Sequence, residues 1–149
     1  MDALLMCGGR GTRLRTDTEK PLVPVGGRLM VDRVCDALAT ADGVDRVVAA
    51  VSPHTPATRT HLAGGNGSTP APGSPTVVET SGEGDVADLD EGMDRGGLAP
   101  PVLTVAADLP LVDAAVVDRV LAAYAARHKP EDDVCSLSVC VPAQRVRAL

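Results

Sequence analysis

Five short, largely apolar runs recur along the chain, and amphipathic or polar segments separate them. We interpret the runs as strands over 2–7, 44–51, 76–79, 102–107 and 134–141. Alternating strands and helices predict a mainly parallel sheet with helices on both faces, a three-layer α/β/α sandwich. In such sheets ligands bind beyond the carboxyl ends of the strands. The loops that follow the apolar runs are therefore the places to look for chemistry.

Local signals indicate where several intervening segments begin and end. The range 28–41 has apolar residues at helical spacing, and Gly43 is well placed to end that helix. The range 56–62 begins with proline, which suits the first helical turn. The range 113–128 begins with an aspartate that suits an N-cap. The Gly-, Pro- and Ser-rich range 64–75 predicts a flexible surface loop.

One further helix is expected from residue 84 or 85 to about residue 94, and it is rich in carboxylates. These are Asp85, Asp88, Asp90, Glu91 and Asp94. At first glance they resemble a metal cluster. We interpret them as a solvated helix face, several of them stabilised by the positive N-terminal end of the helix.

Composition narrows the class of protein. The 149 residues predict one domain, 1–149, and with Tyr124 as the sole aromatic its core must consist of Val, Leu and Ala. No apolar run approaches the ~20 residues of a membrane span, and no signal peptide is evident, which predicts a cytoplasmic protein without a membrane partner. The net charge of −6 argues against nucleic-acid binding. The four cysteines form no C-x-x-C pair, and we expect buried free thiols at Cys7, Cys35, Cys135 and Cys140.

The first apolar run stops at two glycines, and a third follows within the range 8–11. Glycine reaches positive φ without a Cβ penalty, so such a loop can turn several N–H groups toward one anion. Cationic donors surround the loop at Arg10, Arg13 and Lys20. A strand that feeds a glycine loop next to cations is what a triphosphate site needs.

Two better-known phosphate motifs do not fit this loop. A Walker A loop requires a Gly-Lys pair, which the chain lacks. The dinucleotide motif G-x-G-x-x-G begins at Gly9, but Leu14 stands where its third glycine belongs. The remaining alternative is an ordinary tight turn between a strand and a helix.

Three later loops carry further candidate residues. His54 follows the second run and is read either as a base or ribose contact or as an exposed loop histidine. The polar turn 80–85 follows the third run. Asp108 directly follows the fourth run, where it would either hold Mg²⁺ or cap a turn. Because Asp108 would lie beside the glycine loop, we favour the interpretation that it holds Mg²⁺.

The strings GGRGTRL at 8–14 and EKPL at 19–22 resemble the signature of nucleotidyltransferases with a Rossmann-like fold. Together with SPHTPAT at 52–58, ETSGEGDVADL at 79–89 and ADLP at 107–110, they resemble the archaeal GTP:adenosylcobinamide-phosphate guanylyltransferases of cobalamin biosynthesis. The resemblance covers essentially the whole chain. Members of that family continue for several tens of residues beyond the point where this chain stops, so the resemblance implies a C-terminally shortened domain.

The resemblance implies a reaction, partners and a cofactor. GMP would pass from GTP to adenosylcobinamide phosphate, giving adenosylcobinamide-GDP and pyrophosphate, with Mg²⁺ as cofactor. A homodimer is one of the assemblies it allows. Arg13, Lys20 and Asp108 would act in catalysis, with Asp108 holding the metal. The implied nucleotide-binding set is Met6, Gly8, Gly9, Arg10, Gly11, Thr12, Ser52, His54, Thr80, Ser81 and Gly82.

Alternatives stay open at this point. Another nucleotidyltransferase of the superfamily is one, such as the guanylyl- or cytidylyltransferase of molybdenum cofactor synthesis or a sugar-phosphate nucleotidyltransferase. A non-catalytic GTP-binding module is another. An NAD-dependent oxidoreductase is weaker, because Leu14 breaks the dinucleotide motif.

Overall fold

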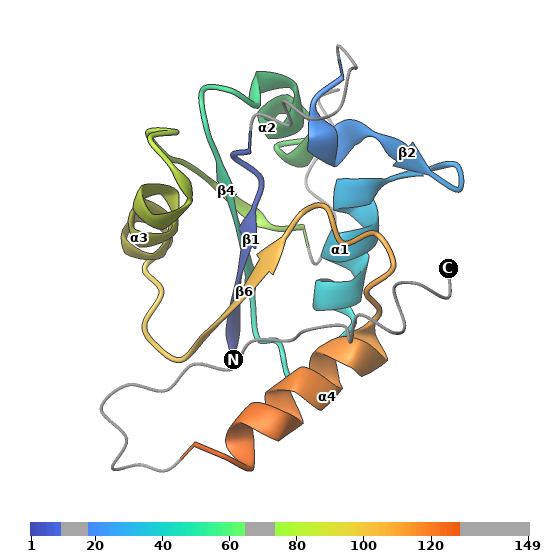
Figure 1. Cartoon of the computed structure of the whole chain (residues 1–149), viewed down its shortest axis with the longest axis vertical. Coiled ribbons are helices and arrows are strands. Elements are labelled where there is room, and N and C mark those ends of the chain that lie inside the picture. The colour runs from blue at the N-terminus through green and yellow to red at the C-terminus, as the bar shows by residue number, and fades with distance from the viewer. Residues whose placement is uncertain (10–17, 65–73, 129–149) are drawn as a thin grey trace, which may run out of the picture.

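The computed structural model describes residues 1–9, 18–64 and 74–128. Within them, four strands form a parallel sheet in the order β5-β4-β1-β6 (Figure 1). The strands are β1 (Asp2–Met6), β4 (Val47–Val51), β5 (Thr76–Glu79) and β6 (Val102–Ala106). The predicted α/β fold with a parallel sheet is confirmed. The strand predicted over 134–141 lies outside the described residues.

Helices cover both faces of the sheet, because β1 and β4 are apolar on both sides. Ala3 and Leu5 of β1 pack in one core with α1 (Met30–Ala39), α2 (Pro56–Leu62) and α4 (Ala114–Ala125). Leu4 points the opposite way and packs with α3 (Asp85–Gly96). Figure 1 shows α3 alone on one side of the sheet, with α1 and α4 on the other. These are the three predicted layers.

Glycine sets the close approach of α3 to the sheet. A Cβ on Gly92 would lie 3.2 Å from Ala50 Cβ and 3.3 Å from the Leu4 methyl groups. The helix therefore packs its backbone directly on β4 and β1. In a core without Phe or Trp, such close packing replaces the volume that aromatic side chains usually fill.

The helix predicted from residue 28 begins two residues later, because a small hairpin precedes it. β2 (Pro24–Val25) pairs antiparallel with β3 (Arg28–Leu29) across Gly26 and Gly27, whose φ angles are +58° and +80°. Arg33 Nε donates to the Val25 carbonyl at 2.9 Å and ties α1 to this hairpin. The second strand likewise starts at Val47 rather than at residue 44, because Val44 is held in a turn by the Ala41 carbonyl.

Cys7 and Cys35 are both free thiols; the prediction of burial is confirmed for Cys7, whereas Cys35 is half-buried. Cys7 is 1% exposed, and burial raises the pKa of its thiol far above the usual range. Burial, with the nearby Asp32 and Asp36 charges, raises the pKa of Cys35 to about 12. Both thiols are therefore protonated and unreactive at neutral pH. Cys135 and Cys140 lie outside the described residues.

Among the described residues, the helices are all too short or too polar to cross a bilayer.

Candidate functional site

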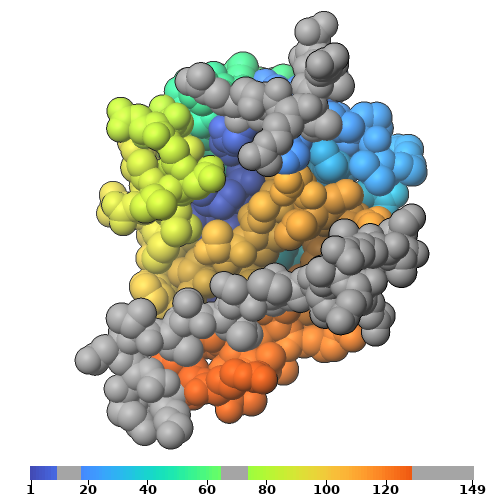
Figure 2. Space-filling view, viewed as in Figure 1, coloured from blue at the N-terminus to red at the C-terminus, as the bar shows by residue number. Residues whose placement is uncertain are grey.

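The carboxyl ends of the four parallel strands meet at one edge of the sheet. Backbone hydrogen bonds continue one residue beyond three of the strands, so the residues that follow are placed side by side. These bonds run from Cys7 N to Ala50 O at 2.8 Å, from Ala107 N to Met6 O at 3.1 Å and from Thr80 N to Val51 O at 2.7 Å. Figure 2 shows the face on which the β1 segment lies in a hollow, between the α3 segment and the segment that follows β6.

Two glycines allow the loops at this edge to touch. Ser52 Oγ donates to the Gly8 carbonyl at 2.8 Å, and a Cβ on Gly8 would lie 3.2 Å from Ser52 Cβ and 3.0 Å from Asp88 Oδ2. Gly82 has a φ of +73°, and a Cβ there would lie 3.0 Å from His54 Nε2. The structure thus brings together four residues predicted to bind nucleotide, from three separate loops.

Asp88 corrects the interpretation of the acidic helix as a solvated face. Its side chain is buried, with the residue 5% exposed, and its Oδ1 accepts from Gly82 N at 2.8 Å. Glu91 Oε2 accepts from Ser81 N at 2.9 Å. Hydrogen bonds from Ser81, assisted by the charge of Arg95, hold the pKa of the Glu91 carboxyl below its usual value.

The turn after β5 is therefore held by two carboxylates that sequence reasoning placed in solvent. Their i, i+3 spacing puts both on one helix face, which was the available signal. Their contact with the Thr-Ser-Gly turn was not predicted, because they follow that turn several residues later in the chain. The remaining carboxylates Asp85, Asp90 and Asp94 are exposed, as expected.

Lys20 and Asp108 meet across 88 positions of sequence. Lys20 lies in a 3₁₀ turn, η1 (Lys20–Leu22), and its Nζ forms an ion pair with Asp108 Oδ2. The two side chains are 37% and 36% exposed, so solvent reaches the pair. The structure thus joins the predicted phosphate-binding cation to the predicted metal carboxylate.

The other predicted site residues differ in their burial and in their contacts. Met6 is half-buried at the end of β1, and Gly9 is exposed, with no described atom within 4 Å of where its Cβ would lie. The Thr80 hydroxyl is buried and donates to the Val51 carbonyl at 3.1 Å, so it anchors the loop. Arg10, Gly11, Thr12 and Arg13 lie outside the described residues.

Metal binding at this edge has a limited set of ligands. In the described part of the chain, no three His, Cys, Asp or Glu side chains gather as a metal cluster would require. Asp108 offers one solvent-accessible carboxylate. This fits Mg²⁺, which is commonly held by one or two carboxylates together with substrate phosphates.

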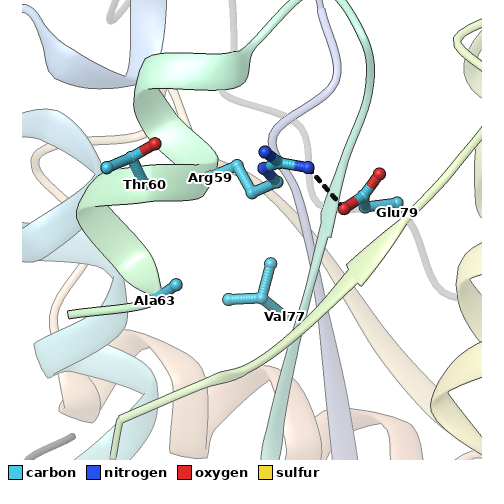
Figure 3. Close-up of a pocket in the computed structure, with 5 residues that line it drawn as sticks. All are labelled: Arg59, Thr60, Ala63, Val77 and Glu79. Atoms are coloured by element: carbon cyan, nitrogen blue, oxygen red, sulfur yellow. Dashed lines mark hydrogen bonds and ion pairs between the residues drawn. The ribbon is translucent and has the colours of Figure 1, made fainter. Parts of the chain in front are cut away.

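A separate pocket of about 470 Å³ lies away from these residues, between α2 and the edge strand β5. Figure 3 shows the Arg59 side chain reaching from α2 to Glu79, with Nη1 and Oε1 2.6 Å apart. The pocket is lined by Arg59, Thr60, Ala63, Val77 and Glu79. Since none of these belongs to the predicted site, we do not assign the pocket to it.

The model of the family described as MobA-like NTP transferase domain matches residues 3–145. An adenosylcobinamide-phosphate guanylyltransferase from Methanocaldococcus jannaschii is 32% identical over 145 residues, which cover 97% of this chain and 70% of that protein.

Solved structures show the same fold at low sequence identity. Rv0371c from Mycobacterium tuberculosis H37Rv is 22% identical with a TM-score of 0.59, covering 81% of this chain and 58% of that one. A further structure of Rv0371c is a complex with manganese. A CMP:2-keto-3-deoxy-manno-octonic acid synthetase in complex with CTP is 16% identical with a TM-score of 0.62, covering 85% of this chain and 48% of that one. The chain thus spans about half the length of these proteins.

The buried carboxylate yields a stability prediction. Asp88→Ala leaves the Gly82 N–H without its acceptor, so we expect the free energy of unfolding to fall by about 1–3 kcal/mol. Urea denaturation at pH 7 measures this. Asp90→Ala, an exposed carboxylate two positions along the same helix, should change it by less than about 0.5 kcal/mol. Equal effects of the two substitutions would contradict the anchoring role of Asp88.

Proposed function

Because this chain belongs to the family of MobA-like NTP transferase domains, we propose that it transfers GMP from GTP to adenosylcobinamide phosphate. The products are adenosylcobinamide-GDP and pyrophosphate, a step of cobalamin biosynthesis. The observation that carries the choice of substrates is the 32% identity to the M. jannaschii guanylyltransferase over nearly the whole chain. The nucleotidyltransferase domain itself is established by the family match.

The proposed reaction needs positioning and charge neutralisation rather than a covalent enzyme intermediate. A phosphate oxygen of the acceptor forms a bond to the α-phosphorus of GTP, and the bond from that phosphorus to the bridging oxygen of pyrophosphate breaks. The backbone of Gly8, Gly9 and Gly11 binds the β- and γ-phosphates. Arg13 and Lys20 offset the charge of the triphosphate and of the leaving pyrophosphate.

Asp108 is the residue proposed to hold Mg²⁺. When bound, the ion supplies a Lewis acid and a template for the phosphates. The neighbouring Lys20 ammonium keeps the carboxylate paired in the structure, so an incoming phosphate and an incoming cation each replace one member of an existing ion pair.

Ser52, His54 and the turn 80–82 are proposed to flank guanine and ribose. His54 and Gly82 are in contact, and Asp88 fixes the Gly82 N–H. The loop that would recognise the base is therefore shaped by side chains of α3. The proposal also includes a cytoplasmic location, a single domain over 1–149 and a homodimer as an allowed assembly.

A cytidylyltransferase is the second candidate, because a solved structure with this fold is a CMP:2-keto-3-deoxy-manno-octonic acid synthetase in complex with CTP. The donor nucleotide separates the two candidates. A chain that binds GTP without turning it over would instead be a GTP-binding module.

The nucleotide experiment tests the proposal directly. Each NTP is incubated with the protein, Mg²⁺ and adenosylcobinamide phosphate, and pyrophosphate release is measured. We expect release with GTP that depends on the acceptor, and little release with CTP, ATP or UTP. Preference for CTP, or turnover with a sugar phosphate in place of the cobinamide, would replace the proposal with another activity of the family.

Lys20 gives a sharper test of the phosphate contact. A charge-assisted contact contributes roughly 1.5–3 kcal/mol, so Lys20→Ala should lower kcat/KM for transfer, or GTP affinity, by at least about tenfold.

The matched control is Arg119→Ala. The Arg119 side chain is exposed on α4 and makes no hydrogen bond or ion pair with the described residues, so its loss should change either quantity by less than about twofold. Arg33 and Arg46 are less suitable controls, because both donate to backbone carbonyls. The variants are compared at one ionic strength, because salt screens exposed charges. Similar losses in Lys20→Ala and Arg119→Ala would remove the main support for a phosphate site.

Asp108 is tested through the metal. We expect Asp108→Ala to abolish Mg²⁺-dependent pyrophosphate release while GTP binding, measured by calorimetry, is weakened but detectable. The physical reason is loss of the carboxylate oxygens that Mg²⁺ prefers. Asp90→Ala, which removes an exposed carboxylate outside the site, should leave both measurements unchanged. Unchanged turnover in Asp108→Ala would return this residue to the capping of a turn.

A further inference from the structure

We propose that Glu19 is a positioning residue that holds Lys20 against Asp108 by binding the first turn of α2. This inference rests on the proposed function, in which Lys20 contacts the triphosphate. It assigns a task to the one charged residue of the EKPL string that the proposed reaction does not use.

The Glu19 carboxylate is fully engaged with α2. Its Oε1 accepts from Ala57 N at 2.8 Å, and its Oε2 accepts from Thr58 N at 2.7 Å and from Thr58 Oγ1 at 2.6 Å. Thr58 is 0% exposed. The contact joins positions 38 and 39 residues apart, so it fixes one loop of the edge to another.

The beginning of α2 lacks a local partner for these N–H groups. Thr55 at the N-cap position makes no side-chain cap hydrogen bond, and the first turn contains no acidic residue. The first N–H groups of a helix have no partner within the helix, and the helix dipole favours a negative charge there. Glu19 supplies both the acceptors and the charge from a distant segment.

The backbone after Glu19 transmits this anchoring to Lys20. Leu22 N donates to the Glu19 carbonyl at 2.9 Å, and Val23 N donates to the Lys20 carbonyl at 3.2 Å. Pro21 is buried, and its ring fixes φ within the 3₁₀ turn. With the carboxylate tied to α2 and the turn closed behind it, Lys20 leaves a defined backbone position to reach Asp108.

A capping role alone makes a different prediction from a positioning role. If Glu19 only stabilises α2, its loss lowers stability and leaves the Lys20–Asp108 pair in place. If Glu19 positions Lys20, its loss frees the ammonium, and the functional cost depends on Lys20 being present.

The chain allows Lys20 to be observed by itself. Its lysines are Lys20 and Lys129, so a Lys129→Arg protein that carries lysine labelled with ¹³C at Cε gives one lysine Cε signal in the NMR spectrum. We expect Glu19→Ala to move the Cε signal to the position that Asp108→Ala gives, where Lys20 has lost its partner. An unchanged signal would overturn the inference whatever the enzyme does.

A double-mutant cycle supplies the functional readout. Glu19→Ala should lower kcat/KM for GTP by about tenfold when Lys20 is present, and by less than about twofold in Lys20→Ala. Urea denaturation of the same proteins should show the same loss of stability with and without Lys20. Equal functional losses in both backgrounds would overturn the positioning role and leave a cap.

Two further results keep the outcomes distinct. If Glu19→Ala does not fold, Thr58→Val removes only the hydroxyl donor and should move the lysine signal part of the way; an unmoved signal would overturn the inference. If Lys20→Ala leaves activity unchanged while Glu19→Ala still moves the lysine signal, the positioning stands and the proposed function of Lys20 fails.

Discussion

The structure depends on β1 being apolar on both faces. Leu4 and Leu5 are both fully buried on opposite sides of the sheet, so neither side can be left to solvent. Burying each leucine contributes roughly 2 kcal/mol or more, and this requires a helix layer on each face. β1 is paired on both edges as well, with β4 and β6. The glycine loop therefore leaves the sheet from one of its two central strands, and the loops after β4 and β6 are brought to it.

Carboxylates hold these loops by accepting from backbone N–H groups. Asp88 and Glu91 hold the turn after β5, and Glu19 holds the start of α2. Asp118 does the same on the opposite side of the molecule, where its Oδ1 accepts from Gly43 N at 3.0 Å. Hydrogen bonds to charged acceptors are among the stronger ones, and each of these is long-range or closes a tight turn. These four carboxylates therefore have a structural use that does not involve a metal.

The sheet could be predicted from the sequence because buried strands appear there as apolar runs. The runs around Leu4 and Val48 are apolar without interruption, the run around Val105 is broken only by Thr104, and the structure places strands on all three. The hairpin at Pro24–Leu29 was missed, since two-residue strands have no periodicity to read. Asp88 was assigned to solvent because helical spacing gives a face but not its neighbours. The neighbours of a side chain depend on the tertiary structure. Here the path of the turn brings the Gly82 N–H to the Asp88 carboxylate.

The side chains of Lys20 and Asp108 are held in defined positions, although their ion pair contributes little to the stability of the fold. More than a third of each side chain is exposed, and such pairs contribute about 0–1 kcal/mol, because water screens the attraction and both side chains lose freedom. The pair therefore does not hold the fold together. The apolar core, the backbone ladders and the long-range hydrogen bonds of Glu19 and Asp88 do that. A weak ion pair between well-anchored residues suits a site that must exchange partners. Little free energy is lost when a phosphate replaces Asp108 as the partner of Lys20, or when a cation replaces Lys20 as the partner of Asp108. The residues next to the pair in sequence are held more firmly. Glu19, which precedes Lys20, binds α2, and Ala107, which precedes Asp108, donates to the Met6 carbonyl; breaking either contact would disrupt the loops.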